Sequence, residues 1–164
     1  MVIPILPMKI KFLDNGNISV LYTDKISVYN SELKEISTVK FESLNSIMAD
    51  IGDEISAFSY NDTLVGNDKT VLVYDEDGKL IAERKYSGEL LKLSVFEKTL
   101  FLMFEDRVVK YDTESGEDLV SKIEPNAVDL VFTASGLPIV CHSGNAEPVF
   151  FENGDATEDS DAVN

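Results

Sequence analysis

An aromatic residue followed by an acidic or amide residue recurs at nearly constant intervals along this chain of 164 residues. The intervals between successive aromatic residues are 45, 37 and 40 residues. The four pairs are Tyr29-Asn30, Tyr74-Asp75, Tyr111-Asp112 and Phe151-Glu152. Each pair ends a short β-rich run, and self-similarity at this period is typical of repeat proteins whose units fold by stacking on one another. The repeat therefore predicts an architecture, but it does not specify an activity.

A second short signal precedes the first three aromatic runs. It is an aspartate followed by a basic residue, in the pairs Asp24-Lys25, Asp68-Lys69 and Asp106-Arg107. Each pair lies between two β-rich runs, and aspartate tolerates the backbone conformations of a tight reversal. Each therefore predicts a hairpin. In the fourth unit a longer loop with a glycine, at 143–146, takes the same place.

Four strand candidates per unit follow from this pattern. The first strands are expected at 8–13, 54–60, 89–96 and 126–133, and a last strand at 36–41, 80–85 and 118–123. In the second unit, residues 63–66 would then form the second strand. The units are expected to begin near Met8, Glu54, Glu89 and Asn126, with little helix apart from one turn that the insertion 42–53 could hold.

Four antiparallel strands in about 40 residues is the size of a β-propeller blade. The stretch 65–75, VGNDKTVLVYD, resembles the end of a WD repeat with tyrosine in place of tryptophan. The chain is thus similar to a degenerate WD-repeat or related quinoprotein-like propeller, although the usual Gly-His pair is absent and there is no tryptophan. The resemblance spans roughly residues 8–152 and implies architecture, not activity.

The predicted domain organisation is a propeller-like repeat domain at 1–152 and an acidic, disordered tail at 153–164. The fourth unit has candidates for only three strands, and the apolar segment 1–6 could supply the missing one or could be a frayed terminus. WD-type propellers usually have more than four blades. Either four blades close on themselves, or a partial ring is completed by a second copy or by another propeller chain, which would cover its exposed end faces.

Charge limits the classes of partner. The chain carries 30 acidic and 14 basic residues, a formal charge of −16. Direct binding to nucleic acid is not expected, because phosphate contacts need lysine and arginine. The acidity either confers solubility or attracts a basic protein client. No stretch is long enough to span a membrane, and the amino terminus does not read as a secretory signal, so a cytoplasmic or nuclear location is expected.

Catalytic, cofactor and metal motifs are not found. The one histidine, His142, follows the one cysteine, Cys141, and neighbours on a strand face opposite sides, so the two cannot act as a nucleophile and base pair. The cysteine is read as a small core residue. The acidic turn at 75–78 reads as a turn with glycine rather than a calcium loop. We expect a non-catalytic protein interaction scaffold, a subunit or adaptor; the alternative is an enzyme built from loop carboxylates on the propeller face.

Overall fold

The computed structural model describes residues 6–41, 48–61 and 68–151. Within these ranges the chain contains strands and turns only, arranged as four antiparallel sheets. None of the described residues forms a helix, so none forms a helix able to cross a bilayer. The predicted all-β class and its antiparallel repeat units are confirmed.

The sheets follow one another along the chain, and we call them blades 1 to 4. Blade 1 contains β1 (Lys9–Phe12), β2 (Ile18–Leu21), β3 (Lys25–Tyr29) and β4 (Glu35–Lys40). Blade 2 contains β5 (Met48–Ile51), β6 (Ile55–Asn61), β7 (Lys69–Asp75) and β8 (Leu80–Tyr86). Blade 3 contains β9 (Leu90–Phe96), β10 (Thr99–Phe104), β11 (Arg107–Asp112) and β12 (Asp118–Lys122). Blade 4 contains β13 (Asp129–Phe132), β14 (Pro138–Cys141) and β15 (Ala146–Pro148). In each blade the strands pair in sequence order, so every connection is a hairpin.

The recurring aspartates and the asparagine shape the turns of the blades. Asp24 and Asp106 lie in the hairpin between the second and third strands, and their carbonyls accept the backbone N–H of Phe41 and Ile123 at 2.9 and 3.0 Å. These bonds tie the end of the fourth strand to the hairpin. Asp68 directly precedes β7, while residues 62–67 lie outside the described part of the chain.

The residue after each tyrosine closes the turn into the fourth strand. Its side-chain oxygen accepts backbone N–H groups further along the turn, which is why an acid or amide recurs there. The bonds run to Asn30 from Glu32 and Lys34, to Asp75 from Asp77 and Lys79, and to Asp112 from Glu114 and Ser115. The bond from Ser115 is the main reason that the pKa of Asp112 lies below its ordinary value. Glu152 lies outside the described residues.

Two strand assignments made from the sequence are wrong. Residues 54–60 are the second strand of blade 2, because β6 pairs with both β5 and β7. The unit thus begins at Met48, inside the segment predicted to be an insertion with a helical turn. Phe151 does not lie in the third strand of blade 4, since β15 ends at Pro148 and only Val149 still bonds back to Pro138, at 2.9 Å. The sequence predicts that strand only by analogy with the tyrosines of the first three units.

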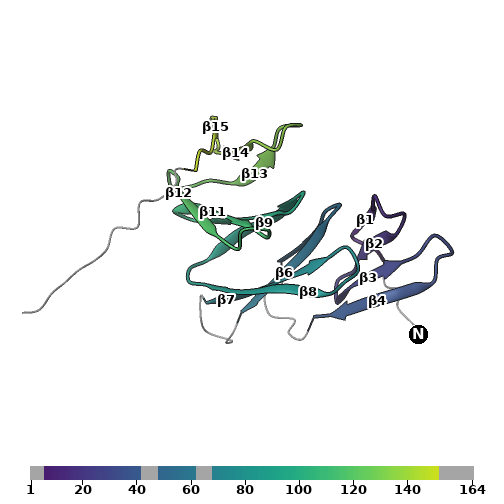
Figure 1. The fold of residues 1–164 in the computed structure, drawn as a ribbon. Helices are drawn as coiled ribbons and strands as arrows, with labels where there is room; N and C mark the ends of the chain where they lie inside the picture. Colours follow the sequence, from purple (N-terminus) through teal and green to yellow (C-terminus); the bar gives the residue numbers. More distant parts are fainter. Residues whose placement is uncertain (1–5, 42–47, 62–67, 152–164) are drawn as a thin grey trace, which may run out of the picture.

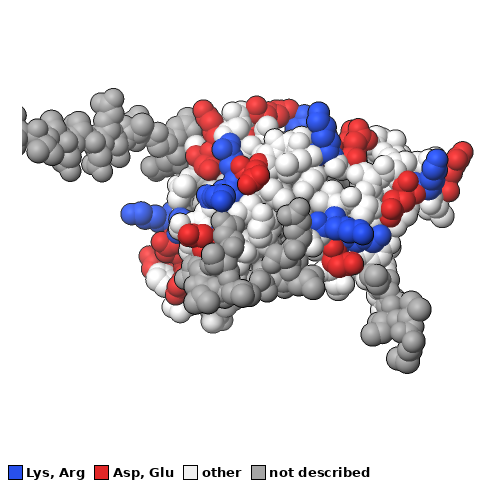
Figure 2. Space-filling model, turned by 90° about the horizontal axis from the view of Figure 1, so that it is seen from below, with Lys and Arg blue, Asp and Glu red and all other residues white. Residues whose placement is uncertain are grey.

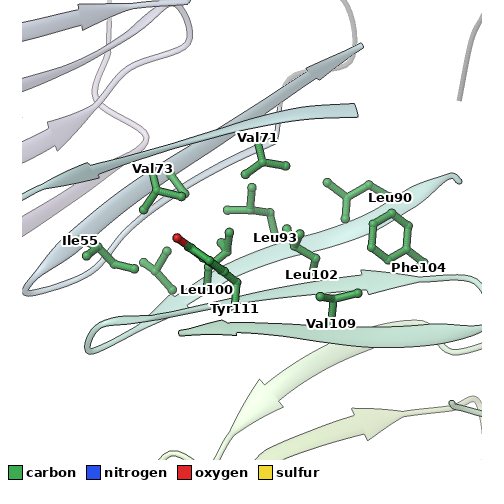
Figure 3. Close-up of a cluster of buried hydrophobic side chains, with 12 residues drawn as sticks. Ile55, Val71, Val73, Leu90, Leu93, Leu100, Leu102, Phe104, Val109 and Tyr111 are labelled. Atoms are coloured by element: carbon green, nitrogen blue, oxygen red, sulfur yellow. The ribbon is translucent and has the colours of Figure 1, made fainter. Parts of the chain in front are cut away.

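Successive blades pack face to face around an axis, with a hydrophobic core at each junction. In Figure 1 they form a fan that runs from blade 1, in purple, to blade 4, in yellow-green, and these two blades lie at opposite ends. Figure 3 shows the largest core, between blades 2 and 3, where Val71 and Val73 face Leu100, Leu102 and Val109. The core between blades 1 and 2 includes Leu21, Ile26, Ile51, Phe58 and Tyr74, and the core between blades 3 and 4 includes Phe101, Val108, Leu130, Val140 and Val149.

Candidate functional site

The tyrosines show that each blade has one face for the preceding blade and one for the next. Tyr74 of blade 2 is 9% exposed and stacks on Phe58 in the core shared with blade 1, with ring centroids 5.8 Å apart. Tyr111 of blade 3 lies in the core shared with blade 2. The guanidinium of Arg84 from blade 2 sits 4.6 Å from its ring centroid, and the hydrogen bond to Tyr111 raises the pKa of Arg84. At both junctions the tyrosine points toward the preceding blade.

Tyr29 occupies the same place in blade 1, but no blade precedes it among the described residues. It is half-buried, and its hydroxyl lies 3.3 Å from both the Tyr22 hydroxyl and a carboxylate oxygen of Glu35. The hydrogen bond to Tyr29 is the main reason that the pKa of Tyr22 is raised. A ring that belongs in an interblade core therefore faces the open end of the fan.

Apolar side chains of β1 share this end. Lys9 and Lys11 reach toward blade 2, where their amines lie 2.5 and 2.9 Å from carboxylate oxygens of Asp50 and Asp53. Because side chains alternate along a strand, the residues next to these lysines face away from blade 2. These residues are Met8, Ile10 and Phe12, and Phe12 is 74% exposed. Together with Tyr29 they define what we call the open face of blade 1.

Leu33 adds to the open face of blade 1. Leu33 is the counterpart of Gly78 in blade 2. The Leu33 N–H donates to the Asn30 carbonyl as the Gly78 N–H donates to the Asp75 carbonyl. Both residues have a positive φ, 61° at Leu33 and 79° at Gly78. At Gly78 an added Cβ would clash with the Ser37 hydroxyl oxygen of blade 1, so this position points at the preceding blade. Leucine at positive φ is strained, and here it is 70% exposed. The strain is consistent with a contact outside the described fold.

Blade 4 has an open face of its own. Leu130, Val140 and Val149 face blade 3, so the alternate residues of the same strands face away from it. These residues include Val131 and Cys141, which are partly exposed, and Phe150 beyond β15 is 68% exposed. Cys141 is therefore not the core residue that the sequence predicts. We call the surface formed by Val131, Ile139, Cys141 and Phe150 the open face of blade 4.

The outer edge of blade 4 is also incomplete. In the other blades a fourth strand pairs with the third, whereas β15 has no such partner within the described ranges. Beside it lies a hollow of about 560 Å³, lined by 121–125 at the end of blade 3 and by 147–150. His142 sits at the end of β14, where its Nε2 lies 3.2 Å from the Glu147 carboxylate. Among the described residues nothing pairs with this edge, so it could accept an added strand or chain. The prediction that the amino-terminal segment supplies this strand concerns residues that lie, apart from Leu6, outside the described part of the chain.

Loop carboxylates gather at a second hollow, where blades 1, 2 and 3 approach one another. Its volume is about 410 Å³, and Asp14, Glu54, Asp75 and Glu76 line it with Lys98. Lys98 lies 2.6 Å from Glu114 and 3.6 Å from Glu54, and the hydrogen bond to Glu114 raises its pKa. Among the described residues no group of three or more His, Cys, Asp and Glu side chains could hold a metal ion. An enzyme built from loop carboxylates would use this hollow.

The charges do not form a single patch on the face that Figure 2 shows. Lysines and arginines alternate there with aspartates and glutamates. Such a mixed surface suits solubility, and it gives a basic partner no continuous acidic area on this face.

Comparison with solved structures identifies the class of fold. The chain is similar to Sqt1 of Saccharomyces cerevisiae, with a TM-score of 0.56 and 12% identity over 92% of this chain and 46% of that one. The WD40 domain of Neurospora crassa Pan2 matches with a TM-score of 0.50 and 14% identity, over 89% and 46% of the two chains. BBS1N, solved in complex with ARL6DN, matches with a TM-score of 0.50 and 11% identity, over 84% and 50%. The fold is a WD40-type β-propeller, and the chain spans about half the length of these structures.

The family follows from the sequence itself. The profile of the DUF5711 family, described as a family of unknown function, matches residues 5–144. The chain belongs to this family. A comparison with curated proteins gave no match.

Sequence reasoning placed the repeat positions but missed most of the open faces. Tyr29, Tyr74 and Tyr111 lie at equivalent places in β3, β7 and β11, while Phe151 lies beyond β15. The period-two alternation of β1, with lysine at 9 and 11 and apolar residues at 8, 10 and 12, was visible in the sequence. It could have shown that one side of the first strand is apolar.

Proposed function

We propose that this protein is a non-catalytic protein interaction scaffold, a subunit of a larger assembly in the cytosol or nucleus, and that protein partners cover its open faces. The observation that carries the proposal is the open face of blade 1. Tyr29 on this face is only half-buried, whereas its counterparts Tyr74 and Tyr111 are buried at the junctions between blades. Exposed apolar patches of this kind mark interaction sites.

The energetic reason is the apolar area that the open face of blade 1 leaves in water. Met8, Ile10, Phe12 and Leu33 are all more than half exposed. Fully burying one such side chain contributes about 1.5–3 kcal/mol, so covering several supplies a favourable term of the same order as the cost of association. This contact is apolar, and it should therefore survive moderate salt, whereas a contact through acidic side chains should weaken as salt screens it.

The solved neighbours agree with this kind of role. BBS1N was solved in complex with ARL6DN, so a propeller of this fold does bind another protein. An acidic chain can steer a basic client, and a propeller-containing chain could continue the fan.

The test compares two exposed apolar positions in cells that express the chain. Phe12→Glu places a charge on the open face of blade 1, and Val120→Glu places one at a 53% exposed position on β12 of the interior blade 3. We expect the wild-type chain and Val120→Glu to elute from size-exclusion columns in a stoichiometric complex, and Phe12→Glu to elute alone. The comparison is repeated at low and moderate salt.

A different set of results would favour the enzyme. A folded chain without any co-purifying protein, together with turnover of a small substrate that is abolished by Glu54→Gln or by replacing His142, would overturn the scaffold and favour the enzyme. Glu54 lines the hollow of carboxylates, and His142 is the one histidine of the chain.

A further inference from the structure

We propose that the partner which covers the two open faces is a second copy of this chain, with blade 4 of each copy packed on blade 1 of the other to close a ring of eight blades. The inference rests on the proposed function, because it takes the open faces to be protein-binding. Eight blades lie within the range of known propellers. Contacts between two different faces close into a ring when the rotation between copies permits it.

The first strands of the four blades, β1, β5, β9 and β13, give the first reason. Their charged residues alternate in sign from blade to blade: Lys9, Asp50, Lys92 and Asp129. The amines of Lys9 and Lys92 lie 2.5 and 2.8 Å from carboxylate oxygens of Asp50 and Asp129 in the next blade. The two aspartates have the same geometry, because each also accepts the N–H of the residue that follows it, at 3.0 and 2.8 Å.

At the junction between blades 2 and 3, Asp50 also forms a hydrogen bond with the blade that follows it. The second carboxylate oxygen of Asp50 accepts the N–H of Val95 in blade 3, at 3.0 Å. Asp129 is the counterpart of Asp50 in blade 4, and no described blade follows it. Blade 1 of a second copy would place Lys9 next in the series, so the alternation of lysine and aspartate would continue around the ring.

The net charges of the end blades are complementary as well. Residues 6–41 contain five lysines and four acidic residues. Residues 123–151, which end the described part of the chain, contain three acidic residues and neither lysine nor arginine. Pairing blade 4 with blade 4 would therefore bring two negatively charged blades together, whereas pairing blade 4 with blade 1 brings blade 4 against a blade whose five lysines outnumber its four acids.

The positions of individual side chains favour the same pairing. At interior junctions the tyrosine of the third strand and the turn after it both contact the preceding blade, as Tyr74 and Gly78 do with blade 1. Tyr29 and Leu33 are their counterparts on blade 1. Packed on blade 4 of another copy, they would meet a sheet that offers Val131 and Ile139, and the strained leucine would gain a contact.

The experiment uses the purified 164-residue chain alone and measures its mass by analytical ultracentrifugation over a range of concentrations. We expect dimers of the wild-type chain. Phe12→Glu and Val131→Glu, one on each open face, should each raise the dissociation constant by about 100-fold or more, because each leaves an unpaired charge in an apolar contact. Val120→Glu, on an interior blade, should leave it within about twofold. Circular dichroism checks that each variant keeps its fold.

Mixing the two variants tests the direction of the contact. In a head-to-tail ring, each variant alone carries a glutamate at both junctions. A mixed pair has one junction with both substitutions and one junction with neither. Equal amounts of Phe12→Glu and Val131→Glu should therefore form mixed dimers, detected by a mass tag on one variant, under conditions where each alone is monomeric.

Three results would overturn the proposal. The first is a wild-type chain that stays monomeric at its highest soluble concentration. The second is a dimer that is lost with Phe12→Glu but unaffected by Val131→Glu, since it would pair two blade 1 faces. The third is growth beyond two copies, which would mean that the ring does not close. If the pure chain is monomeric while Phe12→Glu still releases a cellular partner, this inference fails and the proposed function stands. If dimers form and no other protein is bound in cells, this inference stands and the wider scaffold role fails.

Discussion

The tyrosine repeat allows one substitution to be compared in two structural contexts. Tyr74→Ala removes a ring that is 9% exposed and that stacks on Phe58 between blades 1 and 2. Emptying a buried aromatic site costs about 3–5 kcal/mol. We expect about 3 kcal/mol here, because removing the polar hydroxyl end of tyrosine costs less burial free energy than removing apolar atoms. Tyr29→Ala removes the same side chain from the same position of blade 1, which no described blade precedes. We expect about 1 kcal/mol for this variant, from partial burial.

The assay is urea unfolding followed by far-ultraviolet circular dichroism, in a Phe12→Glu background and at low protein concentration, so that association does not contribute. Both variants should unfold with the slope of the parent, which makes the midpoints comparable. A change of less than about 0.5 kcal/mol for Tyr74→Ala would show that the ring is on the surface and that the repeat alignment is wrong. Equal losses at Tyr29 and Tyr74 would show that a preceding blade covers Tyr29 within one chain, and would refute the open fan.

Three further predictions concern turns. Gly78→Ala should destabilise the chain by at least about 2 kcal/mol, because the new Cβ would clash with Ser37 and the alanine would have to adopt a positive φ. Gly16→Ala also requires a positive φ, +82°, but its Cβ would meet nothing within 4 Å, so it should cost only about 1 kcal/mol in the same unfolding assay. Leu33→Gly should stabilise the isolated chain by about 0.5–1 kcal/mol by removing the strain, and should weaken self-association measured by sedimentation. Asp112 has a pKa below its ordinary value, so its contribution to stability is present above about pH 4 and lost as the pH falls through the folded-state pKa. Asp112→Asn keeps the accepting oxygen, as Asn30 does in blade 1, and should reduce the loss of stability in acid titrations below pH 4; an unchanged acid transition would contradict this role.

The architecture could be predicted because the repeat leaves a local chemical trace. The turn after the third strand needs a side-chain oxygen that accepts several N–H groups, and Asn30, Asp75 and Asp112 supply it at nearly constant spacing. The tyrosine before each of them ends a β-rich run. The repeated turns and the β-rich runs between them, at a period of about 40 residues, predict four strands per unit and the fold class.

The errors have local causes. The first strand of blade 2, β5, has the sequence MADI, which has little β-propensity, so the longer run that became β6 took its place in the prediction. The short β15 begins with Ala146 and ends at Pro148, and the aromatic run beyond it looked more like a strand. In both cases the pairing partners, which a single sequence does not display, decided the assignment.

The open faces could not be read from composition, because it is the direction of a side chain that decides exposure. Lys9 and Ile10 are neighbours, yet one bridges to Asp50 in blade 2 and the other faces away from it. The alternation of Lys9, Asp50, Lys92 and Asp129 was present in the sequence at intervals of 41, 42 and 37 residues, close to the period of the tyrosines. It could have been found by aligning the first strands of the units once β5 was placed correctly.

The ends of a repeat array also bear on the proposed function. In arrays of stacked units, stability is approximately a sum of unit and neighbour terms, and the terminal units need polar outer faces to remain soluble. Blade 1 presents Phe12 and Leu33 on its outer side, and blade 4 presents Phe150. These are not the residues of capping units. Blade 1 resembles blades 2 and 3 in the direction of its tyrosine, and blade 4 resembles blade 2 in its inner aspartate, so both end blades have the features of units that continue the array. A chain built this way should be most stable when its ends are covered, and dilution of the purified protein should lower its unfolding midpoint if a second copy covers them.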